Sequence, residues 1–179
     1  MLVIIPSAGV GNRLGDYTLN LNKGILPVHN IPSIAKIIQS YPVKTEFIII
    51  GGYKFESLFT LISFIFPKKN IKFLKINKFN EDNGSLTYSI KKSLKLINKP
   101  FFFHANDSII IDKKFYSSCL ENTVFISKYN NNNTLYRGVE IIKNKINFLN
   151  KKSVKNNKNF YSYLGVSYIK DFKEFKSFI

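Results

Sequence analysis

The residues best suited to chemistry lie near the start of the chain. Residues 7–15 read Ser-Ala-Gly-Val-Gly-Asn-Arg-Leu-Gly directly after an apolar run, and Lys23 follows a few positions later. Gly9 and Gly11 let the backbone pass close to a ligand, and the N–H groups of such a turn can face an anion. Arg13 and Lys23 add fixed positive charge beside that turn. This combination predicts a binding site for a nucleoside triphosphate.

Two familiar nucleotide-binding motifs do not describe this loop. No Gly-Lys-Ser/Thr sequence closes it, so it is not a Walker A loop. The dinucleotide-binding fingerprint needs a third glycine where this chain has Leu14. The loop therefore predicts phosphate binding of another kind, in which Arg13 and Lys23 supply the charge.

The elements that must position these residues alternate between strands and helices. Over the first 110 residues we expect buried strands at 2–6, 46–52, 71–76 and 101–104, with helices at 32–38, 54–66 and 84–96 between them. Further strands are expected at 124–127, 139–142 and 162–169, and a helix at 171–178. This order predicts an open, mostly parallel, Rossmann-like α/β sheet in three layers. Ligands of such sheets bind at the carboxyl ends of the strands, where the glycine loop, Gly51-Gly52 and Asn106-Asp107 should converge.

The composition predicts one globular domain over residues 1–179. Hydrophobic residues make up 45% of the 179, which is enough to form a packed core. No apolar run approaches the roughly 20 residues of a membrane-spanning helix, and we recognise no signal peptide. The single cysteine, Cys119, excludes an internal disulfide. We therefore expect a cytoplasmic protein without a membrane partner.

The charge of the chain is strongly positive, at +16 from 27 Lys and Arg against 11 Asp and Glu. Such a balance indicates an anionic partner, or else only a coding bias toward lysine. Arg13 and Arg137 are the only arginines in the sequence, although arginine is preferred for bidentate contacts with bases and phosphates. Phosphorylated metabolites are therefore favoured over nucleic acid.

Several segments together resemble one enzyme family. Residues 5–14, the segment Asn-Lys-Gly-Ile-Leu-Pro-Val at 22–28, and Ile-Pro-Ser-Ile at 31–34 are similar to the signature of the sugar-phosphate nucleotidylyltransferases, which have the NTP-transferase fold. The similarity continues in the family's order, through Asn83-Gly84-Ser85-Leu86, Asn106-Asp107, Asn150-Lys151-Lys152 and Tyr163-Leu164-Gly165-Val166. It spans nearly the whole chain and implies the GT-A-like variant of the sheet.

The resemblance also implies a reaction and roles for individual residues. A phosphorylated acceptor would attack the α-phosphorus of an NTP, and pyrophosphate would leave. Arg13 would hold the pyrophosphate, Lys23 would bridge the α-phosphate and the nucleophile, and Asp107 would hold Mg²⁺. Further contacts to the nucleotide and the acceptor would come from Ala8, Gly9, Gly11, Asn12, Asn83, Gly84, Ser85 and Lys152.

The sequence departs from the family's pattern at two points. Asn22 stands where the family usually has a proline before the lysine. The family commonly supplies a second metal-binding aspartate some tens of residues beyond the Tyr163-Leu164-Gly165 region, but this sequence ends at Ile179. Asp171 is available, yet its surroundings indicate the start of a helix. A missing C-terminal part, a single sufficient carboxylate or a substitute residue would each account for this.

The finer assignments follow the resemblance. CTP is favoured because the motifs most resemble cytidylyltransferases of bacterial capsule and surface-polysaccharide pathways. The acceptor is a sugar phosphate, phosphocholine or a phosphorylated amino-acid derivative, and a homo-oligomer is left open. Three alternatives remain: a nucleotide-sugar glycosyltransferase of related fold, a basic nucleic-acid-binding module, and an NTP-binding domain without activity.

Overall fold

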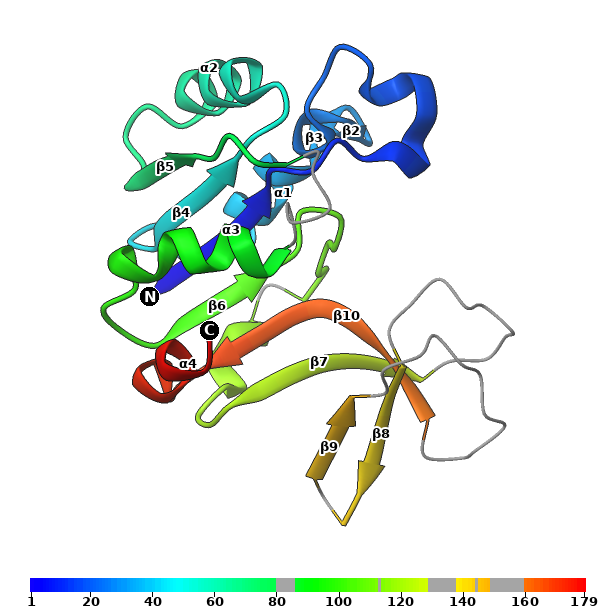
Figure 1. The fold of residues 1–179 in the computed structure, drawn as a ribbon, viewed down its shortest axis with the longest axis vertical. Helices are drawn as coiled ribbons and strands as arrows, with labels where there is room; N and C mark the ends of the chain where they lie inside the picture. Colours follow the sequence, from blue (N-terminus) through cyan, green and yellow to red (C-terminus); the bar gives the residue numbers. More distant parts are fainter. Residues whose placement is uncertain (80–85, 113, 129–137, 144, 149–159) are drawn as a thin grey trace.

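One mixed sheet forms the centre of the protein in this computed structural model (Figure 1). The structure describes residues 1–79, 86–112, 114–128, 138–143, 145–148 and 160–179. The strand order is β5-β4-β1-β6-β10-β8-β9, and β7 also pairs with β10. The parallel half consists of β1 (Leu2–Ser7), β4 (Glu46–Gly51), β5 (Ile71–Lys75) and β6 (Phe101–His104). The antiparallel half consists of β7 (Thr123–Lys128), β8 (Gly138–Ile142), β9 (Lys145–Phe148) and β10 (Phe160–Ile169).

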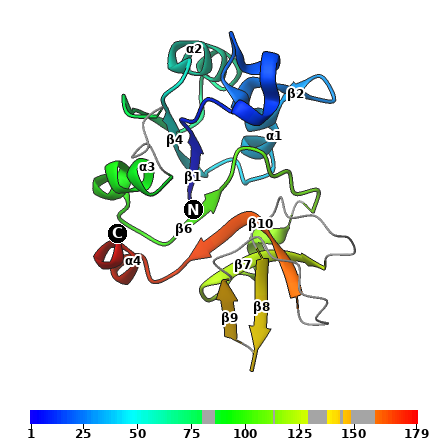
Figure 2. The same cartoon turned by 45° about the vertical axis from the view of Figure 1, so that its right-hand side comes forward.

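Helices cover both faces of the parallel half (Figure 2). Val3 and Ile5 of β1 pack with α1 (Ser33–Gln39) and α2 (Phe55–Ile65). Ile4 faces the other way, into the cluster that includes residues packed from α3 (Leu86–Ser93) and α4 (Phe172–Phe178). Because both faces of β1 are buried, its residues read as a continuous apolar run. The predicted three-layer α/β fold is confirmed.

Short elements that the sequence patterns did not indicate lie around the cavity described below. The segment between β1 and α1 contains two 3₁₀ helices, η1 (Asn12–Thr18) and η2 (Lys23–Ile25), and a hairpin of β2 (Pro27–Val28) and β3 (Ile31–Pro32). Elsewhere η4 (Phe115–Ser118) precedes β7, whereas η3 (Leu94–Leu96) extends α3 within the range of the predicted helix at 84–96. Elements this short have no hydrophobic periodicity, so only tertiary contacts reveal them.

No described helix is both long and apolar enough to cross a bilayer.

Candidate active site

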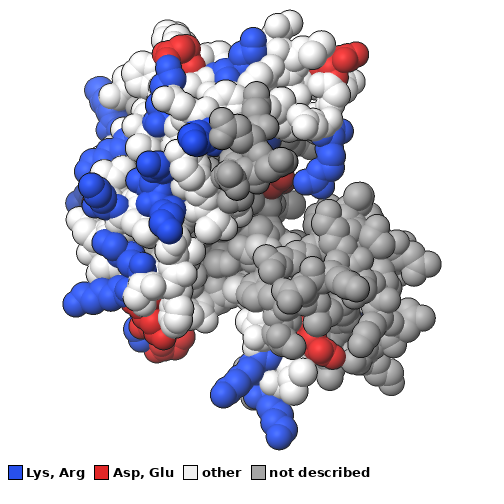
Figure 3. All heavy atoms as spheres, in the orientation of Figure 1, with Lys and Arg blue, Asp and Glu red and all other residues white. Residues whose placement is uncertain are grey.

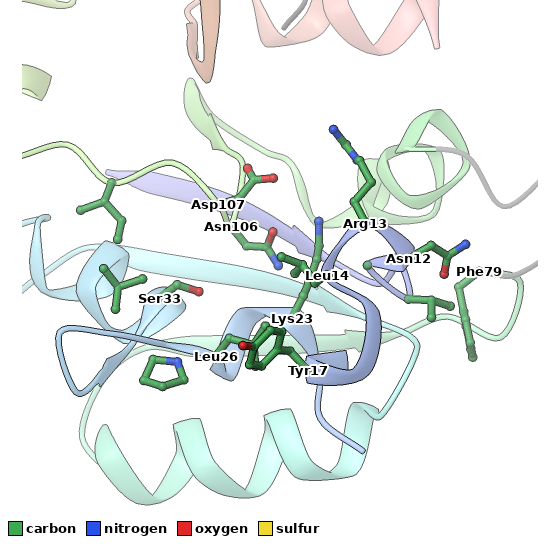
Figure 4. A pocket seen from close by; sticks show the side chains of 15 residues that line it. Asn12, Arg13, Leu14, Tyr17, Lys23, Leu26, Ser33, Phe79, Asn106 and Asp107 are labelled. Carbon is green, nitrogen blue, oxygen red and sulfur yellow. The ribbon is translucent and has the colours of Figure 1, made fainter. Parts of the chain in front are cut away.

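A cavity of about 1060 Å³ opens at the carboxyl edge of the parallel strands (Figure 4). Gly11, Asn12, Arg13, Lys23 and Asp107, all predicted site residues, line it. The remaining lining residues are mostly apolar or aromatic: Val10, Leu14, Tyr17, Leu26, Pro27, Val28, Ser33, Phe79, Asn106 and Ile109. Sequence reasoning did not assign these residues, because an apolar side chain in a loop carries no signal that separates a cavity wall from a core.

Three separate segments supply the charged groups of the cavity. Arg13 comes from η1, Lys23 from η2, and Asp107 from the loop that follows β6. In Figure 4 the three side chains project toward the same side of the site. Arg13 and Asp107 are exposed, whereas Lys23 is half-buried. A polyanion bound here would meet two cations and, through a metal ion, a carboxylate.

The backbone of the first loop is shaped by Gly11. This residue has φ +81°, and the amide of Leu14 donates to its carbonyl at 2.8 Å, which starts the η1 turn. A Cβ at this position would lie 3.2 Å from Cγ2 of Thr18 and 3.3 Å from Cβ of Lys23. Both the positive φ and this close approach favour glycine. Gly11 thus lets the loop pass directly against the stem of Lys23.

The backbone around Lys23 is fixed by a tight turn. Asn22 precedes the turn with φ −67° and ψ 138°, and its side-chain oxygen accepts a hydrogen bond from the Gly24 amide at 2.9 Å. The amide of Leu26 donates to the Lys23 carbonyl at 3.3 Å. A φ of −67° is also the value that a proline ring enforces. The asparagine therefore keeps the backbone angle that a proline would have at this position.

A buried histidine, His104, is hydrogen-bonded to the loop that carries Asp107. The Nε2–H of His104 donates to the Ser108 carbonyl at 2.8 Å, so Nδ1 accepts from the Tyr41 hydroxyl, also at 2.8 Å. His104 is fully buried, and burial lowers its pKa to about 4. The imidazole is therefore neutral at pH 7, and it stabilises the loop through these hydrogen bonds rather than through a charge.

Strand β10 also forms hydrogen bonds with this loop. The Ala105 amide donates to the Gly165 carbonyl at 2.8 Å, and the Ser108 hydroxyl donates to the Leu164 carbonyl. Gly165 has φ +77°, and a Cβ there would lie 2.8 Å from Cβ of Ala105. Residues 163–166, which belong to the motifs that resemble the enzyme family, therefore lie directly against the Asp107 loop.

Some predicted site residues lie outside the cavity wall or outside the described part of the chain. Ala8 is buried, packs in the core, and accepts a hydrogen bond from the Tyr53 amide through its carbonyl. Gly9 is exposed at the start of the loop, and neither residue lines the cavity. Four further predictions, Asn83, Gly84, Ser85 and Lys152, fall outside the described residues, as does Lys151.

Asp107 is the predicted metal ligand, and its setting fits magnesium. Among the described residues, no three His, Cys, Asp or Glu side chains come together as a metal cluster. Mg²⁺ is often bound by one or two carboxylates together with substrate phosphates and water, and an exposed carboxylate on the cavity wall meets that requirement. Asp171 does not share a site with Asp107. Asp171 comes shortly after Ile169, which pairs with Phe101 at the amino end of β6, whereas Asp107 follows the carboxyl end of β6.

The protein resembles solved structures although its sequence has no match among protein families. No protein-family model and no curated protein matches the sequence. Among solved structures, the inositol-1-phosphate CTP transferase from T. maritima superposes with a TM-score of 0.74 and 16% identity, over 98% of this chain and 72% of that one. The CTP:phosphocholine cytidylyltransferase from Streptococcus pneumoniae gives 0.73 and 20%, over 99% and 75%. A UDP-glucose pyrophosphorylase gives 0.71 and 16%, over 98% and 77%.

These likenesses concern the fold and extend over nearly the whole chain. The protein therefore has the nucleotidyltransferase fold, in agreement with the resemblance found in its motifs.

Proposed function

We propose that this protein is a nucleotidyltransferase, which transfers a nucleoside monophosphate from an NTP to a phosphorylated small molecule and releases pyrophosphate. The observation that carries the proposal is the meeting of Arg13, Lys23 and Asp107 on one cavity at the carboxyl edge of the sheet. Ligands of open α/β sheets bind at this edge. The solved structures of similar fold include two enzymes named for CTP and one for UDP-glucose, which supports the same class of substrate.

The cations are suited to stabilise a transition state that is negative throughout. As the acceptor oxygen forms a bond to the α-phosphorus and the bond to the β-phosphate oxygen breaks, charge grows on the departing pyrophosphate. Lys23, half-buried and held by its turn, would face the α-phosphate and the nucleophile. Arg13, on the exposed loop, would hold the pyrophosphate through its planar fork. Positioned charges of this kind supply most of the catalysis in such a reaction.

Asp107 would hold Mg²⁺, and a bound magnesium ion would neutralise phosphate charge at the reacting centre. The loop that carries this carboxylate is held in place by hydrogen bonds from His104 to the Ser108 carbonyl and from the Ala105 amide to β10. A phosphate acceptor is already ionised at pH 7, so the proposed reaction needs no general base.

The acceptor would lie on the side of Asp107 that adjoins β10. Gly165 lets that strand approach the loop closely, because a Cβ there would lie 2.8 Å from Cβ of Ala105 and 2.9 Å from Oγ of Ser108. Lys152, with its neighbour Lys151, is proposed to bind the acceptor phosphate, while Asn83, Gly84 and Ser85 are proposed to contact the base. Ala8, Gly9, Gly11 and Asn12 are proposed to offer backbone or side-chain groups to the triphosphate.

Electrostatic attraction would help both substrates to arrive. Lysine and arginine side chains are spread over the face of the molecule shown in Figure 3, with fewer acidic groups among them, and the chain carries a net charge of +16. A positive surface raises the association rate of polyanions and loses this effect as salt increases. Nucleotides and phosphorylated acceptors are polyanions of this kind.

We also propose the identity of the nucleotide, the kind of product and the compartment. We favour CTP as the nucleotide and a bacterial capsule or surface-polysaccharide precursor as the product, formed in the cytoplasm. A nucleotide-sugar glycosyltransferase is the second candidate by fold, but it calls for two aspartates near the metal. Asp107 is the only acidic residue among the described residues that line the cavity.

A pyrophosphate-release screen tests the proposal. The four ribonucleotides and dTTP are each combined with Mg²⁺ and a panel of sugar phosphates, phosphocholine and phosphorylated amino-acid derivatives. We expect release with at least one pair, and CTP among the active nucleotides. Nucleotide binding by a folded protein without release from any pair would instead indicate an NTP-binding domain that lacks activity.

A further inference from the structure

Three buried polar side chains form a hydrogen-bonded network beneath the cavity. Ser7 and Asn22 are completely buried, and Asn106 is 2% exposed. Ser7 Oγ lies 2.6 Å from Oδ1 of Asn22 and 2.8 Å from Nδ2 of Asn106. Ser7 ends β1, Asn22 precedes η2, and Asn106 follows β6. The network therefore joins three segments that are far apart in sequence.

The partners of Asn22 determine the direction of every bond in the network. Its Nδ2 donates to the backbone carbonyls of Ser7 at 2.8 Å and Tyr53 at 2.7 Å. Its Oδ1 accepts from the Gly24 amide at 2.9 Å, so Ser7 must donate its hydroxyl proton to the same oxygen. Ser7 Oγ can then only accept from Asn106. All four hydrogen-bonding positions of the Asn22 amide are thus used.

Lys23 and Asp107 each lie next to a member of this network. Asn22 and Gly24 flank Lys23, and Asn106 directly precedes Asp107. Gly24 packs directly against the network, because a Cβ at this position would lie 2.7 Å from Ser7 Oγ and 3.3 Å from Asn106 Nδ2. A shift of one loop would therefore strain the hydrogen bonds that hold the other.

We infer that Ser7, Asn22 and Asn106 are positioning residues that set Lys23 against Asp107, and so place the phosphate-binding cation relative to the metal-binding carboxylate. None of the three needs to touch substrate for this role. The inference rests on the proposed function for its effect on catalysis, whereas the coupling between the two loops is a property of the free protein.

The effect on catalysis is tested by a double-mutant cycle between Ser7→Ala and Lys23→Ala. Loss of the central hydroxyl leaves Asn106 without its acceptor, and we expect kcat to fall about tenfold, the equivalent of one buried hydrogen bond. If Ser7 acts through Lys23, Lys23→Ala costs less in the Ser7→Ala background than in the wild type. An equal cost in both backgrounds overturns the inference, while a wild type without any release contradicts the proposed function instead.

The coupling is tested without activity, by amide hydrogen exchange of the free protein. We expect Ser7→Ala to speed exchange about tenfold at the Gly24 amide and also at the Ser108 amide, which donates to the Ala105 carbonyl in the Asp107 loop. The Phe47 amide, which donates to the Asn70 carbonyl at 2.8 Å and belongs to a fully buried residue of the central strand β4, serves as a reference for global opening. Faster exchange at Gly24 alone, relative to that reference, overturns the link between the loops.

Ser93→Ala provides the matched control for both experiments. Ser93 is equally buried, but its hydroxyl donates only to the Ile90 carbonyl within its own helix at 2.7 Å. Its loss should leave kcat and the exchange of both loop amides unchanged. A loss of activity equal to that of Ser7→Ala would mean that removal of any buried hydroxyl harms the enzyme, which also overturns the inference.

Discussion

Lys23 carries the largest share of the proposed chemistry at the scale of single residues. The side chain is half-buried, and its Cβ would lie only 3.3 Å from a Cβ added to Gly11. Its amino group faces the cavity. A cation held in this way needs little reorganisation when charge develops on a phosphate, which is why fixed charges outperform water in such sites. Arg13, on an exposed loop, is less constrained by its surroundings.

We expect Lys23→Ala to lower the rate of pyrophosphate release about 100-fold or more, because one preorganised charge is lost from the transition state. Lys36→Ala is the matched control, since Lys36 is also half-buried but lies on α1 and does not line the cavity. Steady-state kinetics measure the rate, and circular dichroism verifies the fold. Retention of wild-type turnover by Lys23→Ala would remove this residue from the mechanism.

Asp107→Asn tests the proposed metal ligand. The amide keeps the size of the side chain but removes its negative charge, so the Mg²⁺ concentration for half-maximal activity should rise at least tenfold. Asp112→Asn is the control, because Asp112 is an exposed acid that caps a turn and does not line the cavity. Magnesium titrations of both variants compare them, and an unchanged magnesium dependence of Asp107→Asn would contradict the assignment.

At the scale of elements, the loop between β1 and α1 gains its shape from a few special backbone positions. Gly11 and Gly15 have positive φ and bound the first turn of η1. His29 and Asn30 also have positive φ, at 48° and 63°, and form the two-residue turn of the β2–β3 hairpin. Such primed turns match the twist of the strands they join. The loop is therefore ordered by local geometry as well as by the buried network.

Gly11→Ala should destabilise the protein by about 1–2 kcal/mol, the usual cost of a left-handed conformation for a residue with a side chain. The melting temperature would fall by about 2–8 °C for a chain of this size. Gly9→Ala is the matched comparison, because a Cβ there meets no atom within 4 Å and no positive φ is required. Thermal unfolding of both variants tests this, and equal melting temperatures would contradict the strained geometry of Gly11.

At the scale of the whole molecule, the site depends on how the two halves of the sheet meet. The parallel half supplies the loops of Arg13, Lys23 and Asp107, whereas β10 closes the Asp107 loop from the antiparallel half. His104 lies at this junction, where its ring joins Tyr41 to the loop carbonyl. Burial raises the pKa of Tyr41 well above its usual range, so the pair is neutral and its proton positions are fixed.

His104 makes the stability of the fold depend on pH. Its pKa is about 4 in the folded protein and about 6.5 when unfolded, so the unfolded chain binds more protons between these values. The contribution of His104 to the free energy of unfolding is therefore fully present above pH 6.5 and is lost as the pH falls toward 4. We expect the free energy of unfolding to drop by about 2 kcal/mol between pH 7 and pH 5.

Chemical denaturation at several pH values measures this dependence. The variant His104→Gln should lose most of the slope between pH 7 and pH 5, whereas His29→Gln should keep it, since His29 is exposed in a turn. A slope that persists in His104→Gln would assign the pH dependence to other groups.

The fold could be predicted from the sequence, and five of the predicted site residues line one cavity: Gly11, Asn12, Arg13, Lys23 and Asp107. Continuous apolar runs such as 46–51 are typical of strands covered on both faces, and they place the glycine loop and Asp107 at strand ends. The proposed roles of Asn83, Gly84, Ser85 and Lys152 stay predictions, because these residues lie outside the described part of the chain. Ser7 and Asn106 could not be assigned a role, because nothing in a sequence shows that residues 99 positions apart share a hydrogen bond.

The sequence by itself determined the order of the longer strands and helices, the glycine-bearing first loop after β1 and the identity of its cations, because periodicity and side-chain chemistry are local properties. Only the tertiary structure decided which of these groups meet. It placed Asp107 and Lys23 on the wall of one cavity. It left Asp171 at the opposite edge of the sheet, since the direction of β10 is set by its pairing with β6. It also made Asn22, a departure from a familiar motif, a member of a buried network, because hydrogen-bond partners are determined by packing in three dimensions.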